Sequence, residues 1–330
     1  MSAACNVVTR VYDPLFYAVD LPLRSVLYPF GFPVEFSTNS RDVQLAAEES
    51  WGGDPQSFWE TPLEIRVFID GAGPDERATG LVWRAQKHLI TMISDARNFA
   101  VCDLSGRFAY SWLTAATARD RPWMRLFYLD TMVNLLLWYR GFTGIHAGCV
   151  ALDGRGVLLC GASGAGKSCL TYACTRRGWT FISDESPCLL PGGGRTVAGR
   201  PRQIHFRETA FELFPELRGR PVAPNPVGKI SFEVAMAGVQ GVQTSQRCEV
   251  HAVVLLNRNG SEPARLVEIP ADEAFERLKA DFPLFAEPAH QERLAALRHL
   301  VEVGAYELRY SDLDSAVNEL EYLIRHGGSR

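Results

Sequence analysis

The sequence predicts a two-part α/β protein, in which a mainly antiparallel β region with one buried helix precedes a domain built around a phosphate loop. Three observations lead to this fold class. Residues 161–168 read GASGAGKS and match the pattern G-x-x-x-x-G-K-[ST] at every position. Two apolar runs joined by a turn stand before this loop, and a helical pattern follows it. Upstream of residue 141, short strand-like runs dominate.

The composition limits both the organisation and the partners of the chain. Its 330 residues are enough for two domains, and we expect them to span 1–140 and 141–330. The net charge of −4 disfavours a nucleic-acid-binding protein, which would normally carry a basic surface. The N-terminus lacks a signal-peptide pattern. The longest apolar run, 132–139, is far shorter than the ~18–20 residues that span a bilayer. We therefore expect a cytoplasmic protein without membrane or nucleic-acid partners.

The eight cysteines favour reduced thiols over a metal site or a disulfide framework. No two of them form a C-x-x-C pair, and several lie within apolar runs such as GVLLCG (156–161). Zinc sites require clustered ligands at defined spacings, which are missing here. Buried free cysteines in a reducing compartment are the simpler interpretation.

The first region reads as an antiparallel meander with helices. Short, partly alternating runs separated by turn residues predict strands, and they occupy 63–70, 80–85, 88–94, 99–104 and 107–113. Residues 43–50 suit a short helix. Residues 122–141 suit a longer helix, with Pro122 in its first turn and Gly141 at its exit. Apolar side chains cover most of the circumference of this longer helix, so we expect it to be buried.

The second region predicts a mixed sheet with a hairpin that leads into the phosphate loop. The apolar runs 149–152 and 157–160 are separated by Asp-Gly-Arg-Gly, a hairpin signal. A helix should run from Lys167 to about Arg177 and end at Gly178. The nearly continuous apolar run 249–259 predicts a central strand. The remaining expected elements are strands at 179–183 and 305–311 and helices at 271–282, 289–302 and 312–326.

The loop chemistry points to a nucleotide with Mg²⁺, and we expect Mg·ATP. Glycines allow successive backbone N–H groups to face one phosphate, and the following helix adds the positive end of its dipole. Lys167 can reach the β- and γ-phosphates, while the Ser168 hydroxyl can bind Mg²⁺. The expected nucleotide contacts are Gly161, Ala162, Ser163, Gly164, Ala165, Gly166, Lys167, Ser168 and Cys169.

An acidic pair, Asp184-Glu185, follows Lys167 by seventeen residues. One helix and one strand separate them, and this connection returns the chain to the side of the loop. One carboxylate can take a proton from an attacking hydroxyl, and the other can hold Mg²⁺. The plainer alternative is that the pair only ends a strand in solvent. The sequence shows no N-K-x-D guanine motif and no distant acidic strand end of the motor-ATPase type.

Further polar residues are candidates for the same site. His146 stands twenty-one residues before Lys167, and a tight hairpin with strands of equal length would return it to the phosphate end. A basic cluster follows the acidic pair, and it can neutralise phosphoryl charge or bind a substrate. The candidates from this cluster are Arg202, Arg207, Arg218 and Lys229. A solvated basic loop is the alternative.

Together these residues resemble the HPr kinase/phosphorylase family, and more narrowly its diverged HPr-kinase-like branch, the HPr-related serine kinases. The resemblance is carried by His146-Ala-Gly, the loop 161–168, RRGWTFISDE (176–185) and the terminal YELRYSDLDSAVNEL (306–320). It covers roughly 142–326. It implies a hairpin-fed P-loop kinase fold shared with phosphoenolpyruvate carboxykinase, and transfer of the ATP γ-phosphoryl group to a hydroxyl.

The resemblance also assigns residue roles. It implies that Asp184 is the general base, that His146 and Lys167 belong to the catalytic centre, and that Glu185 stands where the family has a metal-binding Asp. The family segment E-I-R-G has one counterpart here, Glu216-Leu-Arg-Gly, which lies several residues later than in the family. Residues 1–140 do not match the N-terminal domain of the HPr kinases. HPr as substrate, the reverse phosphorolysis and the hexamer are therefore not carried over.

The sequence thus predicts an ATP-dependent kinase acting on a hydroxyl, with serine of a protein or peptide as the expected acceptor. Two other functions stay open. One is an ATP-binding regulator without phosphoryl transfer, favoured by the change of the family's second Asp to Glu185. The other is a kinase for a small molecule. A homo-oligomer is compatible with all three.

Overall fold

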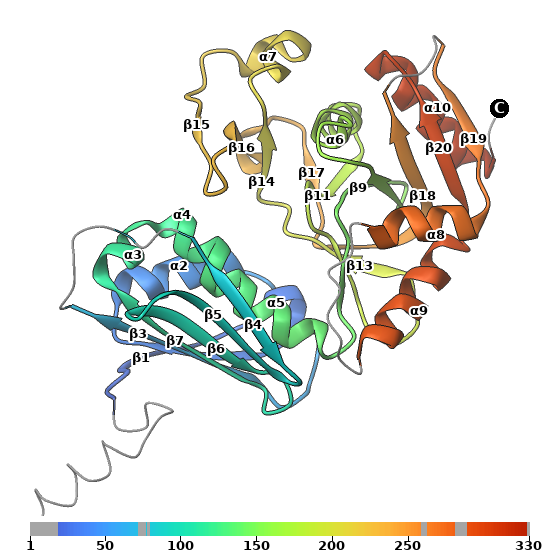
Figure 1. The fold of residues 1–330 in the computed structure, drawn as a ribbon. Helices are drawn as coiled ribbons and strands as arrows, with labels where there is room; N and C mark the ends of the chain where they lie inside the picture. Colours follow the sequence, from blue (N-terminus) through green and yellow to red (C-terminus); the bar gives the residue numbers. More distant parts are fainter. Residues whose placement is uncertain (1–18, 72–76, 78–79, 259–262, 281–288, 329–330) are drawn as a thin grey trace, which may run out of the picture. The chain divides into compact units, whose positions relative to one another are not determined.

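A computed structural model describes residues 19–71, 77, 80–258, 263–280 and 289–328. The chain divides into two compact units, 1–139 and 140–330, and both combine helices with a mixed sheet (Figure 1). Positions 281–282 of the expected helix 271–282 and position 259 of the expected strand 249–259 lie outside the described residues. Within the described part, no helix combines the length and apolar character needed to cross a membrane.

The first unit is built on a seven-stranded sheet with the order β1-β2-β3-β7-β6-β5-β4. Five of its strands, β3 to β7, were expected as a meander, and β4 to β7 do pair antiparallel in sequence order. The sheet is not antiparallel throughout, because β3 pairs parallel with both β2 and β7. A parallel pair needs a crossover connection, and helix α2 supplies the one between β2 and β3. The elements are β1 (Leu23–Leu27), β2 (Val34–Thr38), α2 (Arg41–Trp51), β3 (Leu63–Asp70), β4 (Val82–Gln86), β5 (Leu89–Asp95), β6 (Asn98–Asp103) and β7 (Phe108–Thr114).

The expected long helix of this unit is interrupted. It consists of α4 (Arg121–Met124), a wider π-helical turn over 125–129, and α5 (Asp130–Trp138), after the short α3 (Ala115–Arg119). Its inner side is buried, as expected from its apolar circumference. Trp51 of α2 donates its indole N–H to Asp130 Oδ1 over 3.0 Å. This bond links α2 to α5.

The second unit is built on a ten-stranded mixed sheet with the main order β17-β11-β9-β10-β18-β13-β12-β8, and β20 and β19 continue from β18. The central place expected for the apolar run 249–259 is confirmed: β18 pairs parallel with β10 and β20 and antiparallel with β13. The strands are β8 (Thr143–Gly144), β9 (Ala147–Leu152), β10 (Arg155–Cys160), β11 (Thr180–Ser183), β12 (Cys188–Leu189), β13 (Thr196–Ala198), β17 (Gln243–Thr244), β18 (Arg247–Asn257), β19 (Arg265–Glu268) and β20 (Ala305–Arg309).

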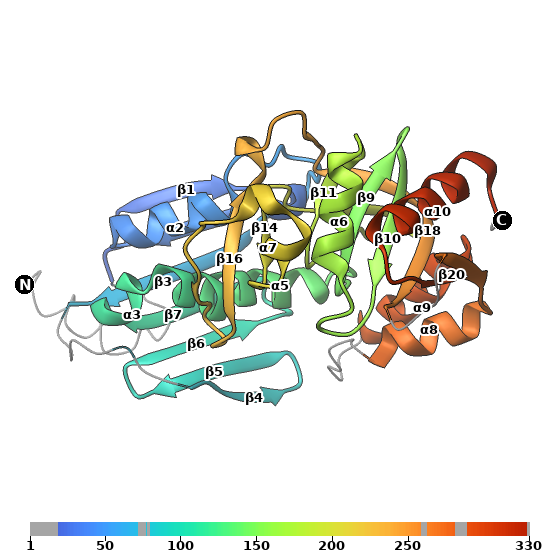
Figure 2. The same ribbon diagram turned by 90° about the horizontal axis from the view of Figure 1, so that it is seen from above.

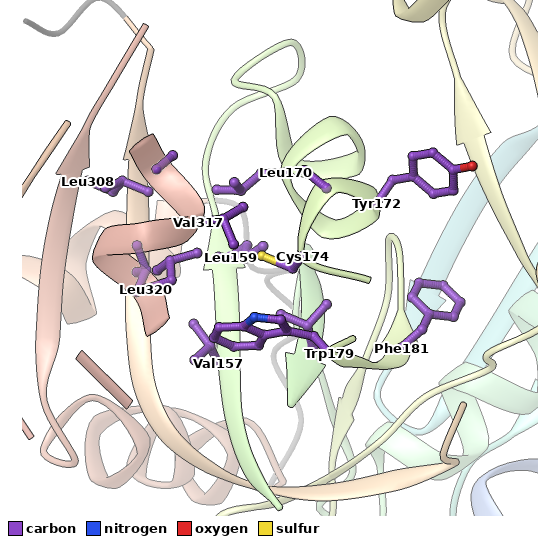
Figure 3. Close-up of a cluster of buried hydrophobic side chains, with 14 of the residues drawn as sticks. Val157, Leu159, Leu170, Tyr172, Cys174, Trp179, Phe181, Leu308, Val317 and Leu320 are labelled. Atoms are coloured by element: carbon purple, nitrogen blue, oxygen red, sulfur yellow. The ribbon is translucent and has the colours of Figure 1, made fainter. Parts of the chain in front are cut away.

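Helices cover both faces of this sheet, which explains why the neighbouring strands β9 and β10 are almost entirely apolar and buried. Val157 and Leu159 of β10 lie in the core on one face, while Leu158 lies in the core on the other. Figure 3 shows the first core, formed with side chains of two helices that include Cys174 and Leu320. The helices are α6 (Lys167–Arg176) and α10 (Leu313–His326) on that face, and α8 (Ala271–Ala280) and α9 (Ala289–Val301) on the opposite face.

A small three-stranded sheet, which we call the arm, extends from this unit in the order β14-β16-β15. Tyr172 of α6 packs edge-on against Phe206 and Phe214 of the arm, with ring centroids 5.4 and 4.8 Å apart. Figures 1 and 2 show the arm beside α6. The arm consists of β14 (Gln203–Phe206), α7 (Ala210–Leu213), a 3-10 turn (Pro215–Leu217), β15 (Ala223–Pro224) and β16 (Ile230–Ala235).

One charged cluster ties β20 to its surroundings. The Glu307 carboxylate accepts hydrogen bonds from Arg277 Nη1 over 2.9 Å and from Arg309 Nε over 2.6 Å. These bonds lower the pKa of Glu307 to about 2. A carboxylate with a lowered folded-state pKa stabilises the fold at pH values above its unfolded pKa, and this contribution is lost as the pH falls through the folded pKa.

We expect Glu307→Gln to lower the free energy of unfolding by ~1–2 kcal/mol at pH 7, since solvent screening at the half-exposed arginines reduces the effect of the full shift. The difference from wild type should shrink below pH ~4.5 and vanish near pH 2. Urea denaturation across this pH range measures it. Glu273→Gln, which removes an exposed partner of Arg277, is the control and should change stability by less than ~0.5 kcal/mol. A Glu307→Gln deficit that does not vary with pH would contradict this account.

Candidate functional site

The register of three strands brings distant segments to one edge of the sheet. The β9–β10 hairpin turns at Asp153-Gly154, both with positive φ, and pairs Ala147 with Cys160. His146 therefore stands beside Gly161, the first residue of the phosphate loop. On the other side of β9, Ser183 of β11 pairs with Cys149. The start of β9 and the ends of β10 and β11 consequently lie at the same edge.

The loop between β10 and α6 is stabilised by a hydrogen bond within the loop and by one from Tyr310, which follows β20. Ala165 N–H donates to the Ala162 carbonyl over 3.0 Å, and the Tyr310 hydroxyl donates to the Ala165 carbonyl over 3.1 Å. Gly166 has a φ of 98°, and a methyl group there would lie 2.5 Å from the Tyr310 hydroxyl. Only glycine satisfies both the backbone conformation and the contact.

Lys167 lies at the centre of the loop. It is 8% exposed, and its ammonium donates to the carbonyl oxygens of Gly161 over 2.6 Å and Ala162 over 3.3 Å. The positive end of the α6 dipole lies at the same place, since α6 begins at Lys167. Both features favour an anion at the loop.

Asp184 places a buried carboxyl beside the loop. The side chain is 6% exposed in total, and its Oδ2 accepts the His205 backbone N–H over 2.8 Å. Its Oδ1 is buried and has no hydrogen-bond partner among the described residues. Burial raises the pKa of Asp184 to about 6, although the His205 N–H and the Ser168 hydroxyl oppose the rise. Such a carboxyl is ionised near neutrality and can still accept a proton.

Ser168 and Glu185 border the same carboxyl. Ser168 is in the first turn of α6, and the charge of the exposed Glu185 contributes to the raised pKa of Asp184. Over the described parts of the chain, no group of three or more His, Cys, Asp and Glu side chains could hold a metal ion by itself. The Ser168 hydroxyl and the Glu185 carboxylate are nevertheless oxygen ligands of the kind that suits Mg²⁺, which in nucleotide sites takes its other ligands from phosphates and water.

Of the basic cluster, Arg207 is the residue that the fold brings to the loop. It follows β14, which is fixed by the bond from His205 to Asp184. Its Nη2 donates to the Ser163 hydroxyl over 3.1 Å, and its Nη1 lies 3.8 Å from the place of a methyl group on Gly164. Arg207 thus approaches the loop from the side on which Asp184 lies.

Glu216 and Arg218 were candidates for contacts with a substrate or a phosphate, and their observed partners lie away from the loop. Glu216 pairs with Arg176 over 2.9 Å, in the last turn of α6 and therefore at the end opposite the loop. Arg218 Nε donates to the Phe211 carbonyl over 3.1 Å within the arm. The reason is the direction of the chain after Arg207. From there the arm packs along α6 toward the C-terminal end of that helix, away from the phosphate loop.

Arg202 and Lys229 were the other basic candidates. The carbonyl of Arg202 accepts the Met236 N–H over 2.8 Å where β14 begins. Lys229 is exposed in the turn before β16, where its backbone N–H bonds to Asn225 Oδ1. For Lys229, no hydrogen bond to the loop is present among the described residues.

Two residues at the loop were missed from sequence. Tyr310 supports Ala165 from below, and Arg258 lies next to Gly166, with its Cδ 3.7 Å from the place of a methyl group there. Arg258 and Tyr310 directly follow β18 and β20, which form a parallel series with β10. Ligands of α/β sheets bind at the carboxyl ends of parallel strands, so the residue after each predicted strand was the available signal.

Comparisons with known proteins add little to this geometry. No protein-family model and no curated protein matches the sequence. A solved structure to which the chain is similar is the HPr(Ser) kinase/phosphatase from Coxiella burnetii, with 15% identity over 56% of this chain and 95% of that chain. The TM-score is 0.29, and a likeness at this level carries no argument about function. The functional case depends on the site itself.

The loop geometry predicts that Gly166→Ala disrupts binding of ATP, the ligand that the motif predicts. The added methyl group must displace Tyr310 or the loop, so we expect at least a roughly tenfold loss of affinity, about 1.4 kcal/mol. Gly178→Ala is the matched control, because Gly178 also has positive φ, 91°, but nothing lies within 4 Å of the added methyl. It should cost about 1 kcal/mol of stability and leave ATP affinity unchanged. Calorimetric titration and thermal unfolding separate the two. Equal ATP affinities in both variants would refute the tight loop packing.

Proposed function

We propose that this protein is an ATP-dependent phosphotransferase that moves the γ-phosphoryl group to a hydroxyl. The observation that carries the proposal is the buried Asp184 carboxyl, with an unpartnered oxygen, at the same sheet edge as a complete phosphate loop. An unpartnered buried carboxylate costs stability, and such groups are concentrated at functional sites. A loop that only binds a nucleotide does not require a proton acceptor beside it.

In this proposal the loop binds the polyphosphate chain of ATP. Backbone N–H groups of 161–166, the N-terminus of α6 and the Lys167 ammonium would surround the β- and γ-phosphates. The bonds of Lys167 to two loop carbonyls support this role, because they hold the ammonium in place before the anion arrives. Arg207, which bonds to Ser163, and His146, whose backbone position is opposite Gly161, would contact the transferred group.

Asp184 would act on the acceptor. Its carboxylate would take the proton of the hydroxyl as the oxygen attacks the γ-phosphorus, the new P–O bond forms, and the bond from the γ-phosphorus to the bridging oxygen breaks to leave ADP. The fixed bond from His205 to Oδ2 leaves Oδ1 for this task. Lys167 and Arg207 would stabilise the negative charge that builds up on the transferring group.

Ser168 and Glu185 would hold Mg²⁺. The ion, when bound, would neutralise charge on the phosphates. The protein's own contribution is to place the Ser168 hydroxyl and the Glu185 carboxylate beside Asp184. Their closeness is supported by their effects on the pKa of Asp184, which Ser168 lowers and Glu185 raises.

The acceptor is proposed by chemical class. A serine hydroxyl of a protein or peptide is the first candidate, following the resemblance of the sequence to serine kinases, and a hydroxyl of a small molecule is the second. Residues 141–330 would form the kinase domain, and 1–140 would contribute a role of their own, for example in binding the acceptor.

Transfer of label from γ-labelled ATP tests the proposal, first with cell extract and then with serine-containing peptides. Asp184→Asn should bind ATP as wild type does and transfer phosphoryl groups at least ~100-fold more slowly, the usual contribution of a general base. Glu185→Gln is the matched comparison. It should need more Mg²⁺ for half-maximal rate while it keeps transfer at high Mg²⁺.

The outcomes separate the three functions. Label on a macromolecule supports the protein kinase, and label on a small molecule supports the small-molecule kinase. ATP binding without label on any acceptor supports the regulator. Near-normal transfer by Asp184→Asn would show that Asp184 is not the base.

A further inference from the structure

Arg258 leaves the sheet beside the phosphate loop. It follows β18, which runs parallel to β10 with Leu255 paired to Cys160. The loop begins one residue after Cys160, and a methyl group on Gly161 would lie 3.5 Å from Leu256. The backbone at the end of β18 is therefore packed against the first residue of the loop.

The side chain of Arg258 extends over the start of α6. Its Cδ lies 3.7 Å from the place of a methyl group on Gly166, the residue before the helix. Its charge also reaches two buried groups nearby. Burial raises the pKa of Cys169 and of Tyr310, and the Arg258 guanidinium opposes both rises.

Arg258 adds a positive charge at the start of α6. Arg258 is exposed, and its guanidinium makes no ion pair or hydrogen bond with any residue in the described part of the chain. It shares its surroundings with the Lys167 ammonium and the positive end of the α6 dipole. Like charges held together in this way raise the local positive potential, which a polyanion would neutralise.

Arg258 and Arg207 stand on opposite sides of the loop. Arg207 comes from the arm and bonds to Ser163, whereas Arg258 comes from β18 and lies next to Gly166. The two guanidinium groups thus border the loop from the β11 side and from the β18 side of β10. Cations at both ends of the loop suit an extended chain of phosphates better than a single phosphate.

We propose that Arg258 binds the polyphosphate chain of a nucleoside triphosphate, on the side of the loop opposite Arg207. This inference rests on the proposed function. A planar guanidinium suits this task because it donates two parallel N–H bonds to non-bridging phosphate oxygens. With Arg258 in this role, the site would recognise the whole triphosphate chain and not only its terminal phosphate.

The test compares Arg258→Gln with wild type for two probes at fixed Mg²⁺. ATP binding is measured by calorimetry, and tripolyphosphate, which lacks base and sugar, is measured by its displacement of a fluorescent ATP analogue. We expect dissociation constants about 10- to 30-fold higher for both probes, the effect of one charge-assisted hydrogen bond. The unfolding temperature should not change, since Arg258 is exposed and unpaired among the described residues.

Arg325→Gln is the matched control. Arg325 is an exposed arginine in the last turn of α10, and the adjacent Ile324 carbonyl bonds to Arg155, at the start of β10 and opposite the loop. Its loss removes the same charge and should leave both dissociation constants unchanged.

Three results would overturn the inference. The first is equal affinity of Arg258→Gln and wild type for both probes. The second is a loss confined to ATP, because Arg258 would then contact the base or the sugar. The third is a wild type in which tripolyphosphate does not compete. Failure of the proposed function is distinct, because wild type would then bind ATP without transferring label to any acceptor, whatever affinity Arg258→Gln shows.

Discussion

The antiparallel pairing of β9 with β10 is the constraint on which the candidate site depends. Because Ala147 stands opposite Cys160, the chain enters β9 where it leaves β10, and β11 on the far side of β9 ends at the same edge. His146, the phosphate loop and Asp184 lie at the same edge because of these two strand pairings. Shifting the register by one residue would move the loop along the edge and exchange the side chains of β10 between the two cores.

The edge so formed carries both a positive and a negative charge. Lys167 is bonded to loop carbonyls, and Asp184 keeps one buried oxygen without a partner among the described residues. This arrangement suits a ligand that brings phosphates to the lysine and a hydroxyl to the carboxyl.

Local patterns predicted the helices and strands of the second unit, 140–330, well. The loop motif, the apolar runs and the glycine that ends α6 each determine local structure over a few residues. The helix after the loop, the central strand and the position of His146 beside the loop could be read in this way. Pairing across long distances could not. No local pattern encodes the tertiary packing that forms the parallel pairs of β3 with β2 and β7. The same holds for the pairing of Glu216 with Arg176 of α6 and for the position of Arg258 next to Gly166.

A crystal structure with Mg²⁺ and a non-hydrolysable β,γ-imido analogue of ATP tests the central claim most directly. The account predicts phosphates seated on 161–168, a γ-phosphate oxygen about 3 Å from Lys167 Nζ, and Asp184 Oδ1 facing the γ-phosphorus from the side open to an acceptor. A nucleotide bound elsewhere, or a γ-phosphate that points away from Asp184, would contradict it.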